Sequence, residues 1–217
     1  MEIMRVLLTG FEPFGGYSEN VSWVVAKKVA TLGILDVEVI TEQIPVSFAR
    51  AGVALRKAVE RHTPNCIIML GQAGNSDHIR LERVALNLKD AKLADNDGVV
   101  ADEETIYADS PAALFTSMPI KTLCKAIEEQ GVAVKISNSC GLYVCNRLYY
   151  EALTICRETT TMQALFVHLP LYDGQASPNI DKPTMPLDSM VKAIKTIIEE
   201  TNDKSRKIQE AVGEGIR

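Results

Sequence analysis

The sequence predicts an α/β fold, in which helices cover both faces of a mostly parallel twisted sheet. Short apolar runs alternate with amphipathic segments along the whole chain. Strands that alternate with helices in this way are typical of βαβ units. The 217 residues suit one domain, and no linker rich in Gly, Pro or Ser divides them. We therefore expect residues 1–217 to form a single domain.

The expected elements follow one another in a regular order. The apolar patterns predict strands at 5–9, 37–44, 66–70, 132–136 and 164–168, and helices at 21–31, 47–62, 120–130, 144–158 and 188–201. Residues 79–87 are strand-like but are interrupted by Glu82. Residues 172–186 contain three prolines and are expected to form a long loop. The polar tail at 203–217 is expected to fray.

Composition excludes several classes of function. The net charge of −5, without a basic block, gives no electrostatic footprint for nucleic acid or anionic lipid. No stretch resembles a signal peptide or a membrane-spanning helix. The five scattered cysteines do not form a disulfide framework, which favours a cytoplasmic location. No cluster of His, Cys or Asp suggests a metal site.

Cys145 is the candidate nucleophile. It follows the strand at 132–136 and a glycine-containing turn, and it lies at the start of the helix at 144–158. Sites in open α/β sheets form at the carboxyl ends of strands. A helix start favours the thiolate and supplies N–H groups for an oxyanion. The alternative is that Cys145 is a small buried hydrophobic residue.

His168 and Glu82 are the candidate partners of this thiol. His168 ends a strand just before Leu169-Pro170, and imidazole is the usual base for a thiol nucleophile. The alternative for His168 is a core histidine with satisfied hydrogen bonds. Glu82 is a candidate for the carboxylate that orients the imidazole, although its neighbours Arg80 and Arg83 make a surface ion pair the simpler interpretation.

The turn after the first strand, Gly10-Phe11-Glu12-Pro13-Phe14-Gly15-Gly16, has neither dinucleotide-binding nor Walker spacing. Its two phenylalanines suit the wall of an apolar pocket for a small flat group. The alternative is a simple hydrophobic plug.

Four motifs together resemble the type I pyroglutamyl peptidase (pyrrolidone-carboxylate peptidase) family of cysteine peptidases. They are Thr9 to Gly16, Glu82-Arg83-Val84-Ala85-Leu86-Asn87, Gly141-Leu142-Tyr143-Val144-Cys145-Asn146 and Phe166-Val167-His168-Leu169-Pro170. The resemblance covers essentially the whole chain in the same order. It implies a cofactor-free, three-layer α/β/α catalytic domain, often a homotetramer. Such an enzyme removes an N-terminal pyroglutamyl residue from peptides.

The resemblance also implies roles for individual residues. Glu82, Cys145 and His168 match the catalytic triad, which overturns the surface-pair interpretation of Glu82. The pocket for the pyroglutamyl ring corresponds to Phe11, Phe14, Asn20, Gln72, Leu142, Tyr143 and Val144. Cys145, through its N–H, and Lys92 are the candidates for holding the oxyanion.

Three positions depart from the family pattern. Gly74-Asn75-Ser76 stands where the family commonly has an arginine-containing segment. Lys92 replaces an arginine, which keeps the charge but loses the planar fork. Cys140 replaces the usual alanine. These changes leave open an activity on another N-acyl amide, and a non-enzymatic binding module with a structural Cys145 is the alternative from a different class.

Overall fold

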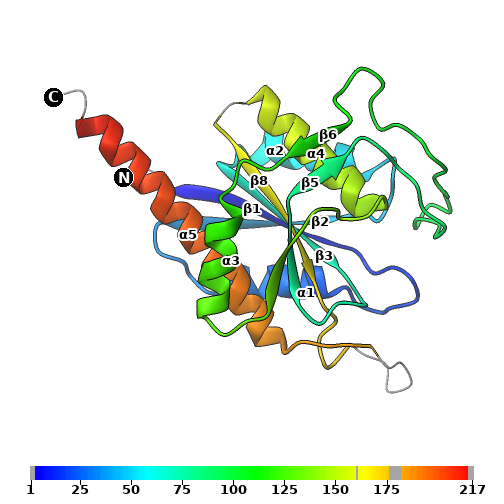
Figure 1. Cartoon of the computed structure of the whole chain (residues 1–217), viewed down its shortest axis with the longest axis horizontal. Coiled ribbons are helices and arrows are strands. Elements are labelled where there is room, and N and C mark those ends of the chain that lie inside the picture. The colour runs from blue at the N-terminus through cyan, green and yellow to red at the C-terminus, as the bar shows by residue number, and fades with distance from the viewer. Residues whose placement is uncertain (1–2, 160, 176–181, 215–217) are drawn as a thin grey trace.

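In the computed structural model, a six-stranded sheet forms the centre of the chain (Figure 1). The structure describes residues 3–159, 161–175 and 182–214, with side chains as far as residue 205. The strand order is β2-β1-β3-β8-β4-β7. These strands are β1 (Met4–Phe11), β2 (Val37–Ile44), β3 (Cys66–Gln72), β4 (Ile79–Glu82), β7 (Val134–Ser137) and β8 (Gln163–Leu169). A separate antiparallel pair joins β5 (Val84–Leu86) and β6 (Ala113–Phe115).

Helices cover both faces of the sheet, as the sequence predicts (Figure 1). On one face, α1 (Val21–Ala30), α3 (Ile120–Glu129) and α5 (Leu187–Glu214) bury their apolar sides. On the other face lie α2 (Ala51–His62) and α4 (Val144–Glu158). Side chains alternate between the two faces along each strand. Leu165 and Val167 of β8 therefore pack in the first core, whereas Phe166 packs in the second core.

Most predicted elements are confirmed, with changes at their ends. The strand at 37–44 and the helix at 144–158 have the bounds that the sequence predicts. The predicted helix start at 47 is wrong, because Ser47 forms a turn in which its Oγ accepts the N–H of Arg50. The predicted helix end at 201 is also wrong, since α5 continues to Glu214 and projects from the body (Figure 1). The predicted loop at 172–186 lies partly outside the described residues.

The directions of β4 and β7 correct the sequence prediction of where the site forms. β4 is antiparallel to β8, and β7 is parallel to β4. The carboxyl end of β7 therefore points opposite to that of β8, so the turn that follows β7 does not begin at a common carboxyl edge. Residues 138–143 instead lead from Ser137 to the start of α4, on the sheet face that carries Phe166.

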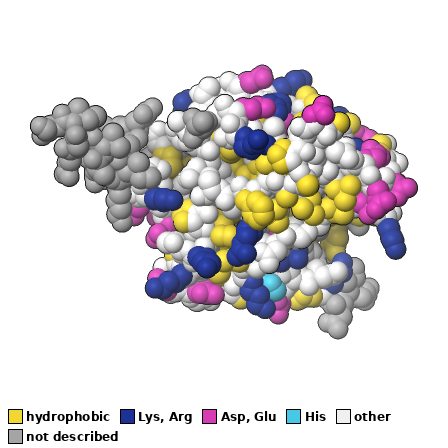
Figure 2. All heavy atoms as spheres, turned by 45° about the horizontal axis from the view of Figure 1, so that its top comes forward, with side chains coloured by type: hydrophobic (Ala, Val, Ile, Leu, Met, Phe, Trp, Pro, Cys, Tyr) yellow, Lys and Arg dark blue, Asp and Glu magenta, His cyan; other side chains and the backbone are white. Residues whose placement is uncertain are grey.

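Several apolar side chains of the described residues are exposed. Phe115, Val99, Val100 and Leu93 are all more than two-fifths exposed. Figure 2 shows hydrophobic side chains gathered on one face, with charged side chains around them. None of the described helices is long and apolar enough to cross a membrane.

Candidate active site

Glu82 and His168 form a buried hydrogen-bonded pair. The two strands that carry them are adjacent, with Arg80 opposite His168 and Glu82 opposite Phe166. His168 Nδ1 lies 2.8 Å from Glu82 Oε1. Glu82 is 0% exposed and His168 is 5% exposed. The interpretation of Glu82 as a surface ion pair is therefore wrong, because its carboxylate is buried against an imidazole.

This pairing fixes which imidazole nitrogen is available. A carboxylate is an acceptor, so the Nδ1 position of His168 carries the proton that it donates to Glu82. The Nε2 position is then left to accept or release a proton elsewhere. Tyr149 strengthens the arrangement from α4, because its hydroxyl donates to the backbone carbonyl of Glu82 at 2.9 Å.

Cys145 lies in the first turn of α4, as the sequence predicts, and is half-buried. Tyr143, the residue before α4, occupies the N-cap in an extended conformation (φ −80°, ψ −167°). No described side chain caps this helix end. The N–H groups of the first turn can therefore receive a negatively charged oxygen beside the thiol.

The ionisation of Cys145 differs from the sequence prediction. Burial, followed by the charge of Glu82, raises the pKa of the Cys145 thiol to about 12. The Arg80 guanidinium and the backbone N–H of Cys145 act in the opposite direction but do not outweigh these effects. The expectation that the helix start favours a thiolate is therefore wrong for Cys145 on its own. The thiol needs a base to take its proton.

Gly71 is a site residue whose role sequence reasoning missed. It lies opposite His168 in the β3–β8 pair. A Cβ atom at Gly71 would lie 2.7 Å from two ring carbons of Phe166 and 3.0 Å from His168 Cδ2. The Phe166 and His168 rings also pack on each other, with centroids 4.8 Å apart. The missing side chain at Gly71 thus makes room for the imidazole.

Asn146, which follows Cys145, ties the start of α4 to the end of β5 and to the residues just after it. Its side chain is fully buried. Nδ2 donates to the carbonyls of Leu86 and Leu88 at 2.8 Å each, and Oδ1 accepts the N–H of Leu86 at 2.9 Å. The Cys140 thiol also lies 3.5 Å from Oδ1. Asn146 therefore sets where the turn before α4 sits.

The structure brings together several of the predicted pocket residues. Phe14 contacts Tyr143 with ring centroids 6.2 Å apart. Tyr143 also packs edge-on against Phe48 at 5.4 Å, and its hydroxyl donates to the carbonyl of Ala94. Phe11 is buried against Phe166 at 6.4 Å. These aromatic residues therefore pack in the same hydrophobic core as Phe166, and sequence reasoning missed Phe48.

Asn20 and Gln72 lie on the side of α1. Asn20 caps this helix, because its Oδ1 accepts the N–H of Ser22, and its Nδ2 donates to the carbonyl of Glu12. Asn20 is 2% exposed, and its hydrogen bond to Glu12 holds the Phe11–Phe14 turn in place. Gln72 ends β3 next to Leu169, one residue beyond the level of His168.

One backbone contact joins the segment that contains Lys92 to the turn that contains Leu142. The carbonyl of Leu142 accepts the N–H of Asp90 at 3.2 Å, which brings the segment around Lys92 to the turn before α4. Val144 is buried in the core at the first position of α4. The Lys92 side chain is exposed.

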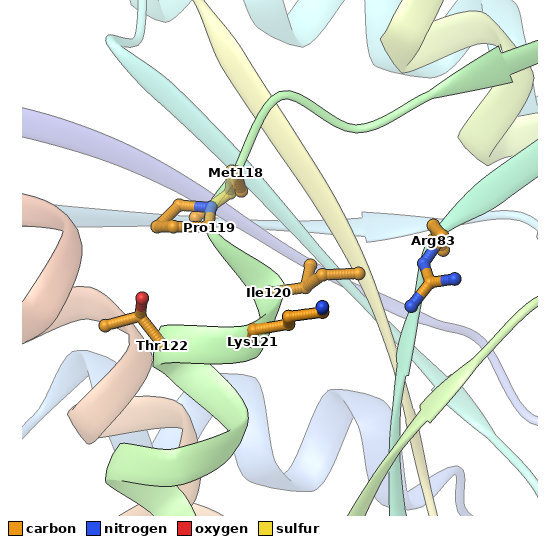
Figure 3. Close-up of a pocket in the computed structure, with 6 residues that line it drawn as sticks. All are labelled: Arg83, Met118, Pro119, Ile120, Lys121 and Thr122. Carbon is orange, nitrogen blue, oxygen red and sulfur yellow. The ribbon is translucent and has the colours of Figure 1, made fainter.

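A hollow of about 440 Å³ lies elsewhere, at the start of α3. Arg83, Met118, Pro119, Ile120, Lys121 and Thr122 line it. The side chain of Lys121 extends toward Arg83 across the hollow (Figure 3). None of the predicted site residues is part of its lining.

A three-layer α/β fold with a buried acid–histidine pair and a cysteine at a helix start is that of a cysteine hydrolase. Comparison with known proteins narrows this class to one family. Residues 4–204 match the family model described as pyroglutamyl peptidase. The chain belongs to this family.

Individual relatives agree with this membership. The chain is 37% identical over 197 residues to a pyrrolidone-carboxylate peptidase of Bacillus cereus, covering 90% of this chain and 92% of the relative. It resembles the crystal structure of pyroglutamyl peptidase I from Bacillus amyloliquefaciens with a TM-score of 0.86 and 36% identity, covering 90% and 95% of the two chains. The pyrrolidone carboxyl peptidase of Thermococcus litoralis gives a TM-score of 0.90 at 33% identity, covering 94% and 96%.

Proposed function

We propose that this chain hydrolyses the amide bond after an N-terminal pyroglutamyl residue of peptides, with Cys145, His168 and Glu82 as its catalytic triad. The hydrogen bond between His168 and Glu82, close to the start of α4, is the observation that carries the assignment of roles. Family membership supplies the reaction class.

Because the pKa of the Cys145 thiol is raised to about 12, the thiol keeps its proton until a base removes it during the attack on the substrate. His168 accepts the thiol proton through Nε2 as the sulfur attacks the pyroglutamyl carbonyl. Glu82 holds the imidazole and stabilises its charged form. The Cys145 N–H and the first turn of α4 hold the resulting oxyanion, with Lys92 as a second candidate.

The tetrahedral intermediate then collapses to a thioester. His168 gives its proton to the leaving amine of the peptide, and the C–N bond breaks. A water molecule, deprotonated by His168, attacks the thioester and releases pyroglutamate and the free thiol. The triad therefore returns to its starting protonation without a cofactor.

The pocket residues suit a flat, uncharged ring. Phe11 and Phe14 supply apolar faces, and Asn20 holds the turn that carries them. Gln72 and the backbone of Leu142, Tyr143 and Val144 are proposed to hydrogen-bond the polar edge of the ring. A pocket that pairs with such groups rejects analogues without them.

A panel of aminomethylcoumarin amides tests this function. We expect rapid release of the fluorophore from the pyroglutamyl amide, and at least about 10³-fold slower release from the prolyl and acetyl-alanyl amides, because both lack the lactam. Preferred cleavage of an acetyl-amino-acid amide would assign the chain to another N-acyl substrate.

We further propose that the enzyme is a homotetramer in the cytoplasm. The hydrophobic side chains gathered on one face in Figure 2 support self-association, since a contiguous apolar surface is typical of an interface. The five free cysteines support a reducing compartment. Sedimentation equilibrium of the purified chain tests the assembly.

A further inference from the structure

His168 is flanked on its two neighbouring strands by a residue without a side chain and by a cation. In the β3–β8 pair it lies opposite Gly71, and in the β8–β4 pair it lies opposite Arg80. Arg80 in turn lies opposite Lys135 in the β4–β7 pair. Residues opposite each other on paired strands point to the same face of the sheet. His168, Arg80 and Lys135 therefore form a row of side chains on the face that carries Phe166.

Arg80 and Lys135 have no ion-pair partner among the described residues. Glu82 lies on the same face of β4, but its carboxylate is hydrogen-bonded to His168 and forms no ion pair with Arg80. A carboxylate oxygen of Asp77 lies 2.5 Å from the ring of the adjacent histidine, and this bond lowers the pKa of Asp77 more than the charge of Lys135 does. Like charges directly opposite each other on paired strands destabilise a sheet. The row therefore favours an additional negative charge beside Arg80 and Lys135.

The Arg80 side chain acts on the catalytic thiol while one of its own donors is unused. Burial, followed by the charge of Glu82, raises the pKa of Cys145, whereas the charge of Arg80 lowers it. The guanidinium is therefore close to the thiol. Its Nε is buried and has no hydrogen-bond partner among the described residues. A buried donor without an acceptor is rare in folded proteins, so this N–H indicates that a ligand supplies the acceptor.

The strand order separates the two ends of a bound substrate. β8 lies between β3 and β4. Phe11 and Phe14, which are proposed for the ring pocket, come from the end of β1 and the turn that follows it, on the β3 side of β8. Arg80 lies on the other side of β8. A substrate whose scissile bond lies at Cys145 and His168, with its ring toward β1, therefore directs its leaving residue toward β4 and β7.

The spacing of the strands matches the spacing of groups along a peptide. Neighbouring strands lie about 4.8 Å apart, and successive residues of a peptide are about 3.8 Å apart. A carboxylate on the residue after the scissile bond can therefore reach the strand next to His168, which carries Arg80. A guanidinium binds a carboxylate through two parallel N–H groups, so Arg80 suits this position.

We propose that Arg80, supported by Lys135, forms a subsite that binds a carboxylate on the residue after pyroglutamate and so determines which peptides are preferred. The carboxylate is either the α-carboxylate of a dipeptide or the side chain of an acidic second residue. In both cases the anion accepts hydrogen bonds from Arg80 and offsets the charge of Lys135. This inference deepens the proposed function and rests on it.

Two pairs of substrates measure this preference and distinguish its two sources. Pyroglutamyl-alanine and its C-terminal amide differ only in the α-carboxylate. The α-amides of pyroglutamyl-glutamate and pyroglutamyl-glutamine differ in the charge of the second side chain. Chromatography of the released product gives kcat/KM for each substrate. Because the same thiol attacks both members of a pair, the effect of Arg80 on the pKa of Cys145 cancels in each ratio.

The variants are Arg80→Met, Arg80→Lys and Lys135→Met, beside the wild type. Lys57→Met is the control, since it removes the same charge at an exposed position of α2. We expect the wild type to prefer the carboxylate-bearing member of at least one pair by about tenfold, because the other member lacks a charge-assisted hydrogen bond. The pair that shows the preference identifies the source of the carboxylate.

Arg80→Met should abolish the preference. Arg80→Lys should keep part of it, because lysine retains the charge but not the planar fork. Lys135→Met should lower the preference by about twofold, as expected for a more exposed cation. The control should leave it unchanged.

Equal kcat/KM values within both pairs for the wild type would overturn this inference, as would an Arg80→Met variant that keeps the wild-type preference. If circular dichroism shows that Arg80→Met does not fold, an unchanged preference in both Arg80→Lys and Lys135→Met would overturn it instead. The pyroglutamyl aminomethylcoumarin amide carries no carboxylate, so its turnover tests the proposed function separately. A wild type that does not cleave this amide overturns the proposed function, and this inference with it.

Discussion

His168 Nδ1 donates to Glu82 Oε1 at 2.8 Å, within a pair that solvent scarcely reaches. The second carboxylate oxygen of Glu82 has no partner among the described residues. Among the described residues, the imidazole is therefore the hydrogen-bond partner of this buried carboxylate. A buried carboxylate held in this way supports catalysis through the histidine.

Replacing Glu82 with Gln tests this relationship. The amide keeps the shape of the side chain but removes the charge and allows the wrong tautomer of His168. We expect kcat for a pyroglutamyl amide to fall by about 10³-fold or more, with a much smaller change in KM. Steady-state kinetics measures both quantities. An unchanged kcat would show that the pair has only a structural role.

Arg80 lies opposite His168 and has a buried Nε with no partner in the described part of the chain. Its positive charge lowers the pKa of Cys145, although burial dominates. Arg80→Met should therefore raise this pKa further and move the rise of kcat/KM to higher pH. Alkylation of Cys145 by iodoacetamide near neutral pH should slow by roughly tenfold for each pKa unit gained.

Arg80→Lys is the matched variant, since it retains the charge and should recover most of the alkylation rate. Equal alkylation rates for the wild type and Arg80→Met would mean that the guanidinium does not act on the thiol.

Gly71→Ala should disturb the imidazole directly. The added Cβ would lie 2.7 Å from Phe166 and 3.0 Å from His168, so the two rings must shift. We expect a loss of about 1–3 kcal/mol in the free energy of unfolding, measured by urea titration, together with a lower kcat. Gly74→Ala is the control, because its Cβ would come no closer than 3.6 Å to another atom. Similar effects of the two substitutions would contradict the proposed packing.

Asn146→Ala should destabilise the turn before α4. It removes the hydrogen bonds to Leu86 and Leu88 and leaves these part-buried backbone groups without the Asn146 side chain as a partner. The expected loss in the free energy of unfolding is about 2–4 kcal/mol. The exposed Asn138 provides a control, since Asn138→Ala should change stability by less than about 0.5 kcal/mol. Equal stability of Asn146→Ala and the wild type would rule out this anchoring role.

Much of the fold can be predicted from the sequence because hydrophobic periodicity is a local property. The strand at 37–44 and the helix at 144–158 are examples. The direction of β4 and β7 is not local, because it depends on which neighbour each strand joins. The short strand β6 carries too few residues for a period to be recognised.

In the candidate site, too, some residues can be predicted from the sequence, whereas others depend on contacts between distant segments. Cys145 and His168 stand out from residue type and position, whereas Glu82 is ambiguous until pairing with β8 buries it. Gly71 acts by leaving space for a residue on another strand. Gln72 and Gln175 are in contact although more than one hundred residues separate them in the sequence. Sequence patterns do not report such contacts.

The role of Cys145 is tested most directly by the turnover of a pyroglutamyl aminomethylcoumarin amide by Cys145→Ser beside the wild type. We predict that kcat falls by about 10³-fold or more while circular dichroism stays unchanged, because a serine hydroxyl is a far weaker nucleophile at this position. Cys124→Ser, on the outer helix α3, should retain the wild-type rate. Substantial turnover by Cys145→Ser would contradict the assignment of Cys145 as the nucleophile.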